Sequence, residues 1–240
     1  MIKYIYVYIL TGDELMSEKK NTYSGIFIVI CMLHVTCLLV SNLIGAKMWA
    51  VTDSIVVPAS VILFPVTYII ADVVTEVYGF RSAKTVIWLG FFCNFIAVIA
   101  YVITIDLPYP ASWIDQDAFA IVFGFTPRVL LSSFVAYLFG AFSNCIILSR
   151  VKVIMKGKKL WVRTIGSSVV GDALDSLIFV TLSFAGMVST SRLVTMIIYQ
   201  YLFKLLFETV LTPLTYYVCN LLKKKEEIDT YDYDKNYRLI

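Results

Sequence analysis

Six long apolar stretches limit what this chain can fold into. They cover about residues 25–45, 55–78, 84–104, 118–149, 161–188 and 193–222 of a 240-residue sequence. A helix needs about 20 apolar residues to cross roughly 30 Å of hydrocarbon, so each stretch is long enough to span a membrane. The chain is 60% hydrophobic and 15% charged, whereas an ordinary soluble domain is roughly 25% charged. The sequence therefore predicts an all-α integral membrane protein with six transmembrane helices.

The six stretches use almost the whole chain and leave no room for a separate soluble catalytic domain. We expect an N-terminal segment over residues 1–24, a transmembrane domain over 25–222 and a polar, disordered tail over 223–240. The codons for Gly12-Asp13-Glu14-Leu15 can resemble a bacterial ribosome-binding site, which makes Met16 a candidate translation start.

The fourth stretch is predicted to be divided. Pro127 suits the first turn of a helix, and Gly124 lies just before it. We therefore expect residues 118–126 to form an interfacial or re-entrant piece that leads into a span beginning near Pro127.

The distribution of Lys and Arg indicates the orientation of the chain. The N-terminal segment, the second and fourth loops and the tail carry 3, 2, 6 and 5 of these residues, whereas the first, third and fifth loops carry 1, 0 and 1. Cytoplasmic loops of membrane proteins carry the excess of positive charge. We expect both termini in the cytoplasm, the protein in the cell (cytoplasmic) membrane, and the basic start of the tail against anionic lipid. Nucleic acid is not indicated as a partner.

Ionisable side chains inside the stretches are the first candidates for a functional site, because a charge at the membrane centre costs at least about 2.5 kcal/mol on insertion scales. The second stretch holds Asp72 and Glu76 on one helical face, the fifth holds Asp172 and Asp175 on another, and the fourth and sixth hold Arg128, Gln200, Lys204 and Glu208. About ten apolar or small residues separate Asp175 from either end of its stretch, and it has no positive neighbour on its own helix. Its partner must come from another helix, with Arg128 or Lys204 as the obvious candidate.

Plainer interpretations compete for some of these residues. Glu76 precedes Tyr78-Gly79-Phe80-Arg81 closely and suits the cytoplasmic end of a helix. Lys204 and Glu208 can pair with each other within one helix, since they are four residues apart. His34 has no acidic neighbour in sequence and fits a core or interface position better than a metal or proton-relay role.

Small residues recur at every fourth position in two stretches, with Ser132, Ala136 and Gly140 in the fourth and Ser167 and Gly171 in the fifth. Such stripes let helix backbones approach closely. Either they serve packing only, or the close contact ends where Asp175 begins and leaves a polar pocket between the helices.

The sequence contains no HExxH, GxSxG or P-loop GxxxxGK[ST] motif, so intramembrane proteolysis and ATP hydrolysis are not indicated. We expect a protein that is not an enzyme and needs no metal or cofactor. The alternative from another class is a membrane enzyme that modifies lipid or prenyl groups with Asp72, Glu76 and a divalent metal. No second acidic cluster on that face completes such a site.

An ordered set of motifs resembles one known family. The motifs are Ser41-Asn42, Phe64-Pro65 with Asp72 and Glu76-x-Tyr78-Gly79, Pro127-Arg128 through Ser133 and Ala136-Tyr137, Gly171 through Asp175, and Gln200-Tyr201 through Lys204. Each motif alone is weak, and their order over roughly residues 25–222 makes the set specific. With them the chain resembles the queuosine precursor transporter family, also called YhhQ or VUT.

The resemblance implies a six-helix inner-membrane transporter similar in fold to the substrate-binding (S) components of energy-coupling-factor vitamin transporters. It implies uptake of 7-deazaguanines such as preQ0, preQ1 or queuine for tRNA queuosine modification. Such a base needs a carboxylate for its adjacent N–H donors, a donor for O6 and an aromatic face. Asp175 is the first candidate for the edge and Glu76 the second. The other candidates are Asn42, Gln200 and Lys204 for O6, Phe64, Tyr68, Tyr137 and Tyr201 for the ring, and Asp72, Asp172 and Arg128 as further members of the site.

Departures from the family pattern bear on substrate and partners. Gln200-Tyr201 stands where some members have an Asp-Tyr pair, which changes what the sixth helix offers a ligand. The first stretch begins without a clear AxxxA-like pattern for docking an energising subunit, so standalone transport is favoured, and a homodimer is compatible with the sequence. The alternative within transport is an S component for another vitamin that depends on an ATP-driven module.

Overall fold

The structure, a computed structural model, describes residues 24–45, 47–52, 55–124, 127–233 and 237. Within these residues six helical segments are long and apolar enough to cross a membrane, which confirms the predicted all-α class. Met16 lies outside the described residues. The elements in chain order are α1 (Gly25–Ile44), β1 (Met48–Thr52), β2 (Ile55–Pro58), η1 (Ala59–Ile62), α2 (Phe64–Tyr78), α3 (Phe80–Asp106), α4 (Gln116–Phe123), α5 (Pro127–Ile154), α6 (Leu160–Phe184) and α7 (Thr190–Glu226).

Local sequence explains several helix boundaries. The Ser24 hydroxyl accepts a hydrogen bond from the Phe27 N–H at 3.0 Å and caps α1. Gly79 alone separates α2 from α3, with a φ of 82° that favours glycine. The predicted division of the fourth stretch is confirmed, since α4 ends at Phe123 and α5 begins at Pro127.

The apolar pattern missed a short hairpin between α1 and α2. We expected the second span to begin near residue 55, but Ile55–Pro58 is strand β2 and pairs antiparallel with β1, with Trp49 opposite Val57. A short apolar run rich in β-branched residues fits a strand as well as a helix, so periodicity could not separate them. The Trp49 ring lies 6.3 Å from the Phe203 ring, which places the hairpin against α7.

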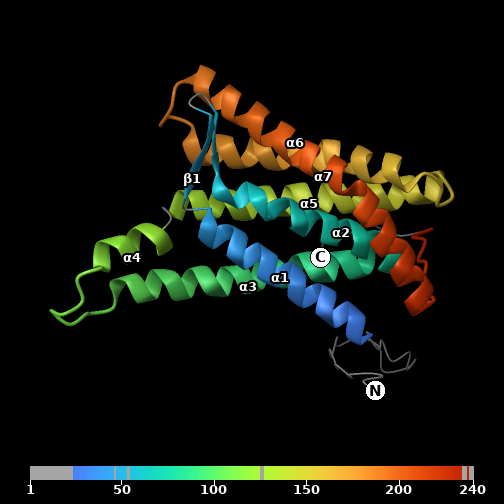
Figure 1. The fold of residues 1–240 in the computed structure, drawn as a ribbon, viewed down its shortest axis with the longest axis horizontal. Coiled ribbons are helices and arrows are strands. Elements are labelled where there is room, and N and C mark those ends of the chain that lie inside the picture. Colours follow the sequence, from blue (N-terminus) through green and yellow to red (C-terminus); the bar gives the residue numbers. More distant parts are fainter. Residues whose placement is uncertain (1–23, 46, 53–54, 125–126, 234–236, 238–240) are drawn as a thin grey trace.

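Helix α2 is the centre of the bundle, between α1 and α3 on one side and α6 and α7 on the other (Figure 1). Eleven of its fifteen residues are buried. Tyr68 and Val74 pack in a core shared with α1, α3 and α5, whereas Val73 and Val77 pack against Leu160 of α6 and α7. The acidic side chains of this helix therefore lie in protein rather than in lipid.

Helices α5 and α6 approach each other closely at glycines. A Cβ atom added to Gly171 would lie 2.8 Å from the Asn144 Cβ and 3.0 Å from the Gly140 carbonyl oxygen. A Cβ atom added to Gly140 would lie 2.8 Å from the Cβ of Asp175. The small-residue stripes thus permit close packing up to the level of Asp175.

The connections rich in Lys and Arg gather at one end of the bundle. Figure 1 shows the turn between α2 and α3, the loop between α5 and α6 and the end of α7 at this end, with the β-hairpin and the turn between α6 and α7 at the other. We call these the basic end and the hairpin end. The arrangement agrees with the alternation of charge along the sequence.

Candidate functional site

A partly open cavity of about 170 Å³ lies toward the hairpin end of the bundle. Its walls come from the C-terminal ends of α1 and α6 and from the N-terminal parts of η1, α2 and α5. The first half of α7 completes the wall. Five of the predicted site residues line it: Asn42, Phe64, Asp175, Gln200 and Lys204. Its other lining residues include Ser41, Ser60 and Ser133, which add hydroxyl groups, and Phe179 and Phe184, which add rings.

The cavity is charged because of one buried ion pair. Lys204 Nζ of α7 binds Asp175 Oδ2 of α6, and both side chains are almost completely buried. The ammonium also lies 4.8 Å from the centre of the Phe64 ring and 5.6 Å from that of Tyr68, so the rings of α2 face the cation. Asp175 thus has the interhelical partner that its position required, while the intrahelical pair of Lys204 with Glu208 is not the arrangement found.

An amide pair links the wall of the cavity to α3. Asn42 Nδ2 donates to Asn94 Oδ1 at 2.8 Å, and the Ser133 hydroxyl donates to Asn42 Oδ1 at 3.4 Å. Asn94 was not among the predicted site residues, although an amide inside an apolar stretch is a signal that could have singled it out.

Tyr137 and Tyr201 do not line the cavity. The Tyr137 hydroxyl is buried and hydrogen-bonds His34 Nε2 at 2.9 Å, so this histidine is a core residue. Tyr201 is half-buried on α7. Arg128 belongs to α5, but its side chain lies outside the part of the chain that the structure describes.

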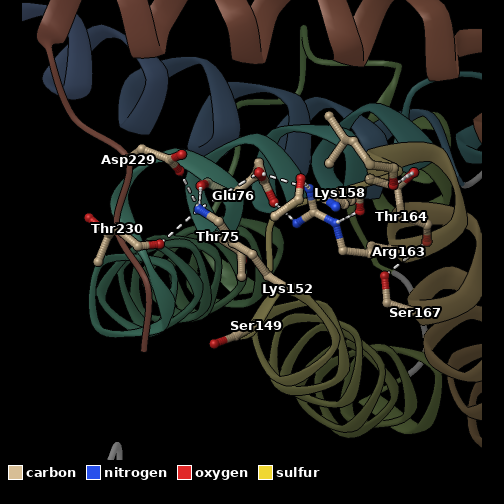
Figure 2. A network of polar contacts seen from close by, with 12 residues as sticks. Thr75, Glu76, Ser149, Lys152, Lys158, Arg163, Thr164, Ser167, Asp229 and Thr230 are labelled. Carbon is tan, nitrogen blue, oxygen red and sulfur yellow. Dashed lines mark hydrogen bonds and ion pairs between the residues drawn. The ribbon is translucent and has the colours of Figure 1, made fainter. Parts of the chain in front are cut away.

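Glu76 also lies away from the cavity, in a network at the basic end (Figure 2). Arg163 of α6 binds both of its carboxylate oxygens, Lys223 Nζ of α7 donates to Oε1 at 2.6 Å, and Lys152 Nζ of α5 lies 3.7 Å from Oε1. Glu76 and Arg163 are 0% and 1% exposed. In the sequence these three cations resemble ordinary topological charges, and their spacing does not predict that they converge on one carboxylate.

The C-terminal tail closes this network. The expected disorder is not seen over residues 227–233, which return to the bundle. Lys152 Nζ donates to Asp229 Oδ1 at 2.5 Å and to the Thr230 carbonyl oxygen at 2.8 Å. The Asp232 carboxylate accepts from the Phe80 N–H at 2.8 Å and the Ser149 hydroxyl at 2.6 Å. Although burial opposes it, hydrogen bonds from Lys152 and Lys223 lower the pKa of Asp229.

A third set of carboxylates lies between the cavity and the basic end. Asn144 Nδ2 donates to Asp72 Oδ1 at 2.6 Å. Asp172 is 0% exposed and neither of its oxygens has a hydrogen-bond partner among the described residues, and Glu208 Oε1 is likewise unpartnered there. Asp72 and Glu208 line a small cavity of about 10 Å³. In the described part of the chain, no group of three or more His, Cys, Asp or Glu residues has the geometry to hold a metal ion.

The geometry can therefore bind a flat polar molecule, since charge, amide and aromatic groups line one cavity. Among the described residues that line it, no nucleophile is paired with a base. A cavity of about 150 Å³ is enough to hold a benzene ring. The arrangement fits recognition without chemistry on the ligand.

Comparison with known proteins agrees with this interpretation. Residues 58–218 match the family described as "Putative vitamin uptake transporter". The chain is 29% identical over 168 residues to the "Probable queuosine precursor transporter" of Bacillus subtilis (strain 168). The aligned region covers 69% of this chain and 72% of that protein. No solved structure matches. Because the family match covers more than half of its length, this chain belongs to the family of vitamin uptake transporters and is a membrane transporter rather than an enzyme.

Proposed function

We propose that this chain takes up a queuosine precursor, a 7-deazaguanine such as preQ0, preQ1 or queuine, across the cell membrane. One observation carries the proposal: the ring of Phe64, the carboxylate of Asp175, the ammonium of Lys204 and the amide of Gln200 line the same cavity. The name of the Bacillus subtilis relative supports the same cargo.

The groups in the cavity match the edges of such a base. A guanine-like edge carries adjacent N–H donors, which the two oxygens of Asp175 can accept side by side. The O6 atom needs a donor, and Lys204, Gln200 and Asn42 all line the cavity. The ring of Phe64 offers an apolar face for the heterocycle. Asp175 and Lys204 are thus the central residues of the proposed site, with Asn42, Gln200 and Phe64 around them.

The position of the cavity suggests how transport proceeds. If the basic end faces the cytoplasm, as the distribution of Lys and Arg indicates, both termini are cytoplasmic and the cavity lies in the outer half of the bundle. The substrate then enters from outside, and the Glu76 network closes the path on the inner side. Release inward requires the helices to move apart at the basic end, with no chemistry on the solute.

Uptake can be tested in a bacterial host that can neither make nor import queuosine precursors. Cells with this gene receive preQ0, preQ1 or queuine, and queuosine in their tRNA is measured. We expect queuosine to return with the wild-type protein, to stay at background with Asp175→Asn, and to return with Asp106→Asn, a matched change at the exposed end of α3. Absence of queuosine with wild-type protein shown to be in the membrane would contradict the proposal, and would favour another vitamin or a missing energising subunit.

A further inference from the structure

Three buried acidic side chains, Asp72, Asp172 and Glu208, come from three helices and interact electrostatically in the middle of the bundle. Asp72 of α2 and Asp172 of α6 both interact electrostatically with Glu208 of α7, and Asp72 and Asp172 interact with each other. All three are at least nine-tenths buried. Like charges in a dry site repel strongly, so three such groups cannot all ionise together.

The hydrogen bonding of the three groups is incomplete. Asp72 receives the Asn144 amide, whereas both oxygens of Asp172 and Oε1 of Glu208 have no partner among the described residues. Glu208 and Asp72 line the cavity of about 10 Å³, which is close to the volume that one water molecule needs. A buried carboxyl without a partner is relieved of its charge by a proton.

The charged and titratable groups around the three carboxyls come from every helix packed there. They are Tyr68 and Glu76 on α2, Cys145 on α5, Asp175 on α6, and Lys204 and Cys219 on α7. Glu76 is held by its own cations at the basic end. Lys204 is the cation that acts on both Asp172 and Glu208, and it is bound to Asp175.

We propose that Asp72, Asp172 and Glu208 form a proton-binding site that couples protons to transport by controlling the position of Lys204. Since the ligand is the one named above, the coupling part of the inference rests on the proposed function. Here the proton is the ligand of the new site, and the small cavity lies beside two of its three carboxyls, Asp72 and Glu208.

The coupling arises because the Lys204 ammonium is attracted both to Asp175 in the substrate cavity and to Asp172 and Glu208 in the proton site. Asp172 is three residues before Asp175 on α6, and Glu208 is four residues after Lys204 on α7, so both are one turn away. The flexible lysine stem lets its ammonium turn toward whichever carboxylate is ionised. While the three groups hold their protons, Lys204 stays on Asp175 and completes the substrate cavity. When Asp172 or Glu208 loses its proton, Lys204 is drawn toward that carboxylate and the cavity loses its donor.

Protons and substrate therefore favour each other's binding. This positive coupling is what uptake driven by an inward proton gradient requires. Binding of substrate draws protons onto the three carboxyls, and by reciprocity their protonation tightens binding. For one linked proton, affinity rises at most about tenfold for each unit of decrease in pH.

The test is calorimetric titration of the purified wild-type protein in detergent with preQ0, which has no amine that titrates near neutrality. Titrations in two buffers of different ionisation enthalpy count the protons taken up. We expect uptake approaching one proton and tighter binding at lower pH. Glu208→Gln should keep the affinity of the low-pH state while losing most of the proton uptake and pH dependence. Asp172→Asn provides a second variant with the same expected loss, and Asp106→Asn should behave as wild type.

A second readout needs no ligand. A protonated carboxylic acid has an infrared carbonyl band distinct from that of a carboxylate, and we expect this band in wild-type protein at neutral pH and its reduction in Glu208→Gln but not in Asp106→Asn. Absence of the band overturns the proton site. Binding of preQ0 without proton uptake or pH dependence overturns the coupling while the proposed function stands. Presence of the band without binding of any deazaguanine supports the proton site and overturns the proposed function.

Discussion

Glu76 and Asp172 are both completely buried carboxylates, yet their surroundings differ. Glu76 is bound by Arg163 and Lys223 and lies near Lys152, whereas Asp172 has no hydrogen-bond partner among the described residues. Removing one charged side chain from a buried ion-pair network leaves its former partners buried without a compensating charge. A group with open hydrogen-bonding capacity can gain a ligand or proton without losing a bond. Under the proposals above, the basic end contributes stability, and the middle and the hairpin end of the bundle contribute binding.

The largest loss of stability is expected from Glu76→Gln. The change leaves three neighbouring cations without their common carboxylate, and breaking a buried pair costs about 3–5 kcal/mol. We expect less folded protein in the membrane and a lower melting temperature in detergent. Glu227→Gln, at an exposed position, is the matched control and should melt as wild type. A Glu76→Gln protein that melts as wild type would contradict the stabilising role of this network.

A smaller effect is expected where α5 and α6 meet. A methyl group at Gly171 would crowd Asn144, which donates to Asp72, and overpacking a tight contact costs about 1–3 kcal/mol. Gly171→Ala should lower the melting temperature measured in detergent. Gly166→Ala is a sharp control, since it adds a methyl group to the same helix where nothing lies within 4 Å and Ala suits a helix better than Gly. Equal melting of the two variants would show that the close contact does not matter.

The smallest effect concerns the tail. Asp229 is 41% exposed, so its ion pairs with Lys152 and Lys223 are worth less than about 1 kcal/mol each. Their hydrogen bonds lower its pKa below the ordinary 3.8, against the effect of burial. The stabilisation is therefore present above that value and is lost as the pH falls through the lowered pKa. The protection of the backbone amides of residues 227–233 from hydrogen exchange, taken relative to the intrinsic rate at each pH, should decrease in Asp229→Asn and in acid, and unchanged protection would contradict the docked tail.

The sequence predicted the spans well because long apolar runs constrain a membrane chain strongly. It also predicted the Lys204–Asp175 pair as one of two options, since a charge isolated in the middle of a helix must find a partner on another helix. The convergence of three cations on Glu76 was harder to predict. Arg163, Lys152 and Lys223 lie far apart in sequence and each resembles an ordinary loop charge, so their common contact with Glu76 emerges only when α2, α5, α6 and α7 are packed.

The remaining misses have similar physical causes. The β-hairpin at Met48–Pro58 was hidden in apolar sequence that fits a helix or a strand. The docked tail was hidden in polar sequence, because its order depends on a few specific bonds from Lys152, Phe80 and Ser149 rather than on apolar burial. Asn94 and Asn144 could have been found by treating buried amides in the same way as buried charges.

The most direct test of the central claim is equilibrium binding of preQ0 to purified wild-type and Asp175→Asn protein. Hydrogen bonds to a charged group contribute about 1.5–3 kcal/mol each, so losing the Asp175 carboxylate should weaken binding by roughly tenfold to a hundredfold or more. Asp106→Asn should bind as wild type. A folded Asp175→Asn protein with unchanged affinity would contradict the assignment of the cavity between Asp175 and Lys204 as the substrate site.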